Sequence, residues 1–202
     1  GIAHNFLKNG YEVFVWNRDK KKLADITTQG ALAVNTPKEA AERAELVIEV
    51  TANDESSRSV WTGDDGILAG ANTDSVLISC ATLSVAWADE LIELCAKQGL
   101  TFFDMPMTGG RVGAEAGSLI LLAGGDKEKL EAVKPVLAAI SQKVMHFGPA
   151  GSGAKYKLLL NMLQAIHIAG FGEVMKIAKS HGMDLKAVGD ALAERPGGTT
   201  TT

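Results

Sequence analysis

The feature that most constrains the fold is an alternation of short apolar runs with stretches of helical pattern. Leu46–Thr51 is a nearly continuous apolar run, which is typical of a strand covered on both faces, and Val85–Lys97 has helical spacing. Strands separated by helices indicate βαβ units, so the sequence predicts an α/β fold with a doubly wound, mostly parallel sheet. The other predicted strands are Tyr11–Trp16, Ser75–Ser79, Thr101–Asp104, Ser118–Ala123 and Val144–Phe147. The other predicted helices are Asp19–Gln29, Thr36–Arg43 and Lys127–Ile140.

The C-terminal part of the chain has a different pattern. From Gly153 to about Ser180 it stays helical and is apolar on every side, as is typical of a helix packed between other helices. A second helix is expected to begin near Asp184, a good N-cap, and to end before Pro196. We therefore expect a sheet domain over residues 1–150 and the start of an all-α substrate or dimerisation domain over residues 151–202.

The N-terminal residues predict a helix that leads into the strand Tyr11–Trp16, which is the second half of a dinucleotide-binding βαβ unit. The strand and the G-x-G-x-x-G turn that open such a unit have no counterpart in the sequence. In the doubly wound order that strand is central, so we expect a gap in the sheet. We interpret the chain as a fragment whose first strand, phosphate-binding glycines and last helices are missing, and Gly1 is not assigned as one of those glycines.

Composition excludes several classes of function. The net charge of -4 provides no basic surface for nucleic acid. No uninterrupted apolar run approaches the roughly 20 residues that span a bilayer. The two cysteines, Cys80 and Cys95, form no C-x-x-C pair, which favours reduced thiols in a cytoplasmic protein. The four histidines do not have the spacing of metal ligands, so we expect no metal site.

Three segments carry the candidate chemistry. Residues 104–110 read DMPMTGG, residues 80–84 read CATLS, and residues 151–161 contain Gly-Ser-Gly followed by Lys157 and Asn161. In their order and spacing they resemble the D-x-P-[VM]-[ST]-G-G, S-T-[VI] and G-x-G-x-x-x-K-x-x-x-N segments of the β-hydroxyacid dehydrogenases. This resemblance covers almost the whole chain. It implies a Rossmann-type NAD(P)-binding domain and a hydride transfer between a nicotinamide cofactor and a small hydroxy- or oxo-acid.

Lys157 is the candidate catalytic residue. Lys157 and Asn161 are four residues apart on a predicted helix and therefore share a face. Burial and the helix N-terminus both disfavour the ammonium form, and a lysine with a lowered pKa can exchange a proton with a substrate oxygen. The resemblance implies that Lys157 is the general acid/base and that Asn161 binds the substrate or the lysine. Without the resemblance, the better interpretation of Lys157 is an ordinary solvated lysine, since most lysines on helices are solvated.

The turn Thr108, Gly109 and Gly110 is the candidate substrate-binding segment. It follows a predicted strand, at the carboxyl edge of the sheet where ligands bind. Glycines there let backbone N–H groups approach a carboxylate, and the Thr108 hydroxyl adds a donor. The alternative is an ordinary Gly-Gly turn. Thr108 stands where the family usually has Ser, and Arg111 is either a further substrate contact or a surface residue.

The candidate cofactor contacts begin at the end of the strand Tyr11–Trp16. NAD-binding folds place Asp or Glu there, whereas an arginine accommodates the extra phosphate of NADP. Asn17 and Arg18 therefore predict NADP, with NAD as the alternative and a solvated helix face as the non-functional one. The other candidate cofactor contacts are Val50, Thr51 and Ala52, where the family commonly has M-L-P, and Thr82, near the nicotinamide. Glu49 has no explanation in the sequence.

The resemblance implies a reductase or dehydrogenase of a short β-hydroxyacid or its semialdehyde. Candidate substrates include 3-hydroxyisobutyrate, tartronate semialdehyde, glyoxylate and succinic semialdehyde. The alternatives are an enzyme like 6-phosphogluconate dehydrogenase and a non-catalytic relative that keeps the fold for binding or oligomerisation. We expect a small carboxylate substrate, no nucleic-acid or membrane partner, and a homodimer or homotetramer.

Overall fold

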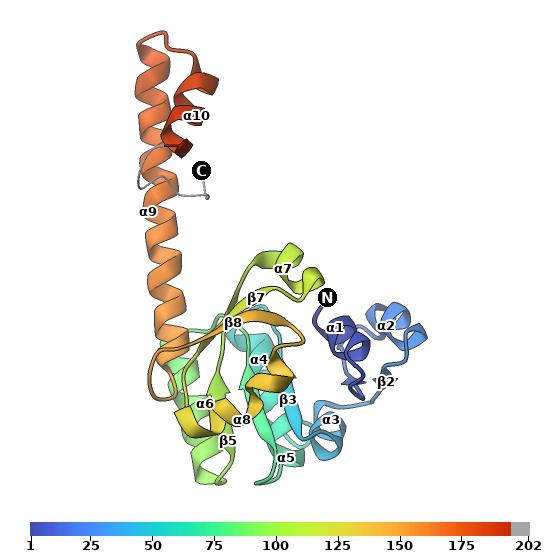
Figure 1. The fold of residues 1–202 in the computed structure, drawn as a ribbon. Helices are drawn as coiled ribbons and strands as arrows, with labels where there is room; N and C mark the ends of the chain where they lie inside the picture. Colours follow the sequence, from blue (N-terminus) through green and yellow to red (C-terminus); the bar gives the residue numbers. More distant parts are fainter. Residues whose placement is uncertain (195–202) are drawn as a thin grey trace. The chain divides into compact units, whose positions relative to one another are not determined.

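The chain divides into two compact units, and the structure, a computed structural model, describes residues 1–194 (Figure 1). The first unit is Gly1–Lys157, and the second begins at Leu158, inside the helix α9 (Ser152–Ser180). The second unit also contains α10 (Leu185–Glu194), while Pro196 lies outside the described residues. The domain boundary predicted at residues 150 and 151 stays a prediction.

Three parallel strands form the centre of the first unit. β3 (Leu46–Glu49), β4 (Val76–Ser79) and β5 (Thr101–Asp104) pair in this order. The helices α4 (Asp54–Trp61), α5 (Ile67–Gly70) and α6 (Val85–Lys97) lie between these strands in the sequence. The predicted α/β fold with parallel strands is therefore confirmed.

Both faces of this sheet are covered. Neighbouring residues of a strand point to opposite faces, and in β4 Leu77 and Ile78 belong to two different buried clusters. Leu77 packs in the cluster that contains Trp61 of α4 and Trp87 of α6. Ile78 packs in the cluster that contains Phe6 of the N-terminal helix. This two-sided burial is the physical reason for the apolar runs in the sequence.

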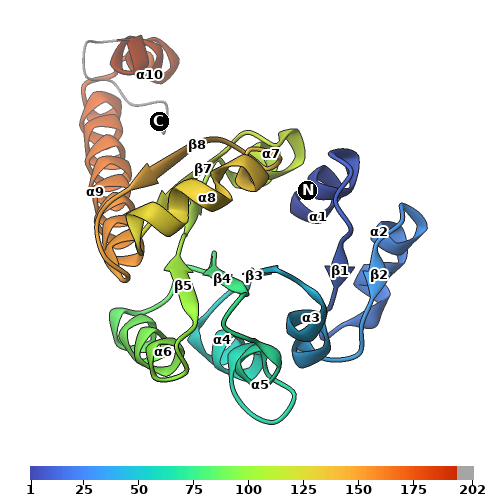
Figure 2. The same ribbon diagram turned by 60° about the horizontal axis from the view of Figure 1, so that its bottom comes forward.

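The sheet is interrupted between β1 and β3. Among residues 1–194, β1 (Phe14–Val15) pairs only with β2 (Leu32–Ala33), in a separate two-stranded parallel sheet (Figure 2). On the other side of the interruption, the carbonyl groups of Glu45 and Glu49 accept bonds from the next strand, β4, and from Cys80 just after it. The expected gap is therefore present. β1 is shorter than the predicted strand Tyr11–Trp16, because pairing on one edge alone supports fewer ladder bonds.

A third sheet follows the central strands. Its order is β6 (Met107–Thr108), β7 (Leu119–Ala123) and β8 (Ser141–His146), with β6 antiparallel to β7. Between these strands lie α7 (Gly110–Ala116) and α8 (Lys127–Leu137). Pro135 lies inside α8, which ends two residues later, earlier than the predicted end at Ile140. An isolated bridge between Asp104 and Gly124 joins the end of β5 to the residue after β7.

Short elements account for most differences from the sequence prediction. The predicted helix Asp19–Gln29 is a 3-10 turn, η1 (Lys20–Leu23), followed by α2 (Ala24–Thr28). The helices α4, α5 and α7 and the strands β2 and β6 were not predicted, since elements of two to eight residues carry little periodicity. The remaining helices are α1 (Ile2–Lys8) and α3 (Pro37–Arg43).

In the second unit, α9 exposes many apolar side chains, among them Leu159 and Ile177, at 61% and 57% exposure. By length and mean hydropathy, 1.3 in its most apolar window, α9 meets the criterion for a membrane-spanning helix. A single such helix is weak evidence, because core helices of soluble proteins meet the same criterion. This helix was not predicted as a candidate membrane span, because polar residues such as Asn161 interrupt its apolar run. The absence of a membrane partner stays a prediction.

Candidate active site

Lys157 lies in the second turn of α9 and contacts the segment after β5. Its Nζ atom donates a hydrogen bond of 2.9 Å to the carbonyl oxygen of Met107, fifty residues earlier in the chain. The side chain is half-buried, and this burial lowers the pKa of the Lys157 amine. The structure therefore brings the predicted proton-transfer residue beside the residue that precedes Thr108.

The start of α9 is held by Asp104, the last residue of β5. Asp104 is only 3% exposed, and its carboxylate oxygens accept hydrogen bonds of 2.6 Å from the backbone N–H groups of Gly151 and Ala154. Burial raises the pKa of the Asp104 carboxyl, while these backbone hydrogen bonds oppose the rise. The sequence placed Asp104 in the substrate motif without a separate role.

Two glycines allow three backbone segments to meet beside Asp104. A Cβ atom at Gly153 would lie 2.1 Å from the carbonyl oxygen of Leu122 and 2.7 Å from that of Asp104. A Cβ atom at Gly124 would lie 2.4 Å from the Asp104 side chain. The second glycine of the Gly-Ser-Gly segment therefore allows close packing of α9 against β5 and β7.

The candidate substrate segment crosses from β6 into α7. Thr108 is half-buried and pairs with Ile120, and Gly109 and Gly110 follow with φ angles of +120° and +59°. Side chains rarely adopt such angles, so this turn depends on its two glycines. Arg111 forms an ion pair of 2.7 Å with Glu115, and its side chain is 90% exposed, which fits the surface alternative.

Asn161 is the one predicted site residue in the second unit. It is exposed and lies on α9, four residues after Lys157. Lys155, two residues before Lys157 on α9, forms an ion pair of 3.6 Å with Asp89 of α6. The two lysines of this turn therefore have separate partners.

A cleft of about 670 Å³ lies where the sheet is interrupted. It is lined by Phe14 of β1, by Ile48 of β3 and by all of the predicted cofactor contacts except Thr82, namely Asn17, Arg18, Val50, Thr51 and Ala52. Arg18 is exposed, and Lys22 adds a second cation to the lining. Asn17 Oδ1 accepts a hydrogen bond of 2.9 Å from the N–H of Asp19, so local bonds shape this turn.

Glu49 also lines this cleft, and the structure explains its presence inside a strand. Its side chain is 3% exposed and accepts hydrogen bonds from Ser79 Oγ, at 2.7 Å, and from Thr51 Oγ1. A buried carboxylate is tolerated when such donors satisfy it. The hydroxyl of Thr51, another residue that lines the cleft, is thus directed toward Glu49.

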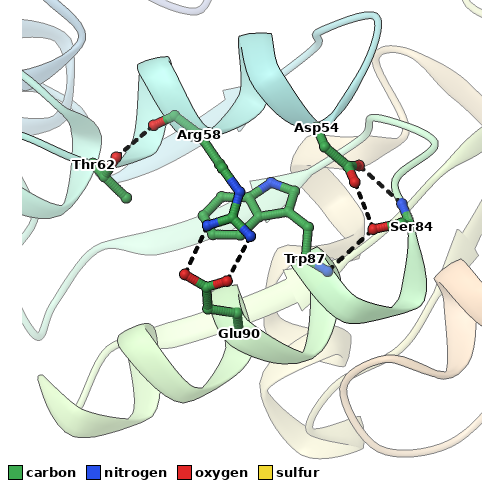
Figure 3. A network of polar contacts seen from close by, with 6 residues as sticks. All are labelled: Asp54, Arg58, Thr62, Ser84, Trp87 and Glu90. Atoms are coloured by element: carbon green, nitrogen blue, oxygen red, sulfur yellow. Dashed lines mark hydrogen bonds and ion pairs between the residues drawn. The ribbon is translucent and has the colours of Figure 1, made fainter.

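Thr82 lies on a turn that packing holds in place. It is exposed, whereas its neighbours Ala81 and Leu83 are buried. Asp54, at the start of α4, accepts hydrogen bonds of 2.9 and 2.5 Å from the N–H and hydroxyl of Ser84 (Figure 3). The Thr82 hydroxyl is therefore presented on the surface by a turn fixed on both sides.

A second contact joins α4 to α6, the helix that begins after Ser84. Arg58 of α4 forms a bidentate ion pair with Glu90 of α6, and its guanidinium lies 4.0 Å from the ring centroid of Trp87 (Figure 3). This network was not predicted from the sequence, because α4 itself was not predicted. The capping pattern at Asn53 and Ser56 is the signal that could have revealed the helix.

Other nucleophiles and metal ligands do not form a second centre in residues 1–194. Cys80 and Cys95 are buried, and burial raises the pKa of the Cys95 thiol to about 12. Within the described part of the chain no group of His, Cys, Asp and Glu side chains could hold a metal ion.

These features define a class: a Rossmann-type dinucleotide-binding domain with parallel strands, followed by a long helix that bears a lysine. Residues 1–148 match the family described as the NAD binding domain of 6-phosphogluconate dehydrogenase. The 3-hydroxyisobutyrate dehydrogenase of Pseudomonas aeruginosa is 32% identical over 98% of this chain and 66% of its own length. The chain thus spans slightly less than two thirds of that relative.

Solved structures agree with this match. The 3-hydroxyisobutyrate dehydrogenase of Mycobacterium tuberculosis with L-serine has a TM-score of 0.91 and 26% identity, over 100% of this chain and 68% of that one. Psf3 in complex with NADP+ and 2-OPP has a TM-score of 0.87 and 27% identity, over 99% of this chain and 71% of that one. The chain belongs to the family of the 6-phosphogluconate dehydrogenase NAD binding domain, and the predicted resemblance to the β-hydroxyacid dehydrogenases is confirmed.

Proposed function

We propose that the chain is the cofactor-binding part of an enzyme that transfers a hydride between NADP(H) and a small β-hydroxyacid or the matching semialdehyde or oxo-acid. One observation carries the proposal, the hydrogen bond of 2.9 Å from Lys157 Nζ to the Met107 carbonyl. It sets a half-buried amine next to the turn formed by Thr108, Gly109 and Gly110. A carboxylate bound at this turn leaves the substrate oxygen within reach of Lys157.

In this proposal Lys157 handles the proton. When bound, the nicotinamide supplies the hydride for reduction and accepts it in oxidation. During reduction the Lys157 ammonium gives a proton to the carbonyl oxygen, and during oxidation the neutral amine takes one from the hydroxyl. A lowered pKa of Lys157 increases the neutral fraction near neutral pH, so oxidation should speed up as pH rises through that pKa.

The cofactor assignment rests on the charge of the cleft. Arg18 can form two parallel hydrogen bonds to a phosphate, and Lys22 lines the same cleft. The relative Psf3 is known with NADP+. We propose NADP over NAD, with Asn17, Val50, Thr51, Ala52 and Thr82 as further cofactor contacts.

The substrate class rests on the relatives. The names of the P. aeruginosa and M. tuberculosis proteins specify 3-hydroxyisobutyrate, and the M. tuberculosis structure has L-serine. Both molecules carry a hydroxyl on the carbon β to a carboxylate. We propose that Thr108, Gly109 and Gly110 bind this carboxylate and that Asn161 binds the substrate or Lys157. The match to the 6-phosphogluconate dehydrogenase domain keeps a sugar phosphate as the second candidate substrate.

The test is Lys157→Ala in the full natural chain, with Lys155→Ala as the matched control from the same helix turn. Oxidation of 3-hydroxyisobutyrate, L-serine and 6-phosphogluconate is measured with NADP, and NADPH binding is measured separately. We expect kcat to fall about 10²–10⁴-fold in Lys157→Ala, with NADPH binding retained, and Lys155→Ala to remain close to the parent. Unchanged turnover in Lys157→Ala would refute the catalytic role. A parent that binds NADPH and oxidises none of the three would favour the non-catalytic alternative.

A further inference from the structure

Asp104 is a buried carboxylate to which the proposed reaction gives no role. It joins three segments that are far apart in the sequence. Its side chain accepts hydrogen bonds from the backbone of Gly151 and Ala154 at the start of α9. Its own carbonyl oxygen accepts a bond of 2.8 Å from the N–H of Gly124, just after β7. With 3% exposure, this carboxylate is sealed from solvent by the segments it joins.

These contacts form a closed ring that includes Lys157. Ala154 and Lys157 are three residues apart in α9, so an amide fixed at Ala154 fixes the helix turn from which the Lys157 side chain projects. The Lys157 Nζ atom in turn bonds to Met107, only three residues after Asp104. Movement of α9 along its axis would therefore break the bonds to Asp104 and the Lys157–Met107 bond together.

We propose that Asp104 is a positioning residue, which caps the first turn of α9 and thereby holds the Lys157 amine half-buried against the Met107 carbonyl. This inference rests on the proposed function only for the importance of Lys157. The position and burial of the amine are measurable without substrate or cofactor.

Action of Asp104 through position and action through charge predict shifts of opposite sign in the Lys157 pKa when Asp104 is replaced. If Asp104 acts through position, loss of the cap loosens the helix turn and exposes the amine, and the Lys157 pKa rises toward the ordinary lysine value of 10.5. If Asp104 acted mainly through its negative charge, removal of that charge would disfavour the ammonium, and the Lys157 pKa would fall. The geometry favours the first, since Asp104 contacts backbone amides and Lys157 contacts a carbonyl group.

The experiment measures the rate at which acetic anhydride labels Lys157 across pH, by mass spectrometry of digests, with the other lysines as internal reference. Asp104→Asn keeps the size of the side chain but removes the charge and one acceptor. The matched control is Asp126→Asn, because Asp126 caps α8 through the N–H of Lys129 and has no bond to α9 in the described structure. We expect a higher pKa of Lys157 in Asp104→Asn and none of this rise in Asp126→Asn. A lower or unchanged pKa in Asp104→Asn would overturn the proposal, as would an equal rise in the control.

Should Asp104→Asn not fold, hydrogen exchange of the unmodified chain tests whether Asp104 caps α9. The amides of Gly151 and Ala154 should exchange at least tenfold more slowly than unstructured amides, and unprotected amides would overturn the proposal. The outcome is separable from the proposed function. If Lys157 shows this labelling response but Lys157→Ala keeps full turnover, the proposed function fails and the positioning role stands. If turnover depends on Lys157 but Asp104→Asn does not change the labelling of Lys157, the positioning role fails and the proposed function stands.

Discussion

The two ends of the candidate site are built in different ways. The Lys157 corner, meaning Asp104, Met107, Ala154 and Lys157, is held by hydrogen bonds between residues 47 to 50 positions apart in the sequence. The Arg18 edge, meaning Asn17, Arg18 and Lys22, is shaped by bonds between near neighbours, such as that from Asp19 to Asn17. Moreover, the neighbouring strand β1 pairs on one side only within the described part of the chain. Tertiary contacts thus fix the geometry of the corner, whereas local turns shape the edge.

The largest expected effect is on stability, and it separates the two regions directly. Gly153→Ala would place a Cβ atom 2.1 Å from the carbonyl oxygen of Leu122, in backbone that cannot move without breaking the Lys157 corner. We expect a loss of unfolding free energy on the order of 3 kcal/mol, at the upper end for overpacked sites, measured by urea denaturation. The matched control near the Arg18 edge is Gly30→Ala.

Gly30 has a φ angle of +107° and no atom within 4 Å of an added Cβ. Alanine there adds backbone strain of about 1–2 kcal/mol without a clash. If Gly30→Ala destabilised the chain as much as Gly153→Ala does, close packing would not distinguish the corner from the edge.

The same contrast explains what the sequence could predict. The motifs at 104–110 and 151–161 indicated the segments that form the Lys157 corner. Each motif is short, and its glycines and its lysine stand at fixed positions because the tertiary structure requires them there. The parallel strands β3 to β5 could also be predicted from the sequence, since burial on both faces leaves continuous apolar runs. The capping role of Asp104 was not readable, because it depends on a contact across 50 residues.

Other features left weaker signals. Glu49 looked out of place in an apolar strand, and only the donors Ser79 and Thr51 explain it. The network of Arg58 and Glu90 joins residues 32 positions apart, and nothing in either local sequence pairs them. Short helices such as α5 and α7, of four and seven residues, span at most about two turns and leave little periodic pattern in the sequence, so tertiary packing defines them.

The next largest effect concerns the cofactor at the Arg18 edge. In Arg18→Ala we expect the affinity for NADPH to fall about 10–100-fold, since charge-assisted hydrogen bonds contribute about 1.5–3 kcal/mol. The affinity for NADH should change little, and it serves as the internal control. Isothermal titration of both cofactors in the full natural chain measures the ratio. An unchanged ratio would remove the case for NADP and leave Arg18 as a solvated residue.

The smallest expected effect is a pH dependence of the unfolding free energy, and it arises from Asp104 in the Lys157 corner. Burial raises the pKa of Asp104 above its ordinary value of 3.8. At pH values between 3.8 and the raised pKa, Asp104 keeps its proton in the folded state but has lost it in the unfolded chain. The contribution of Asp104 to stability therefore falls as pH rises through this range. Asparagine does not titrate. The unfolding free energy of the parent should therefore decline relative to Asp104→Asn across this range, by about 1.4 kcal/mol for each unit of the pKa rise, and then level off.

Urea denaturation of the parent and of Asp104→Asn at a series of pH values between 3 and 8 measures this difference. If the backbone hydrogen bonds to Asp104 outweighed its burial, the folded pKa would lie below 3.8 and the parent would gain stability relative to Asp104→Asn as pH rises. The sign therefore reports whether burial of this carboxylate opposes folding. A decline would mean that the contacts which position Lys157 are retained although the buried charge destabilises the fold. The Arg18 edge, whose charges are solvated, has no such conflict.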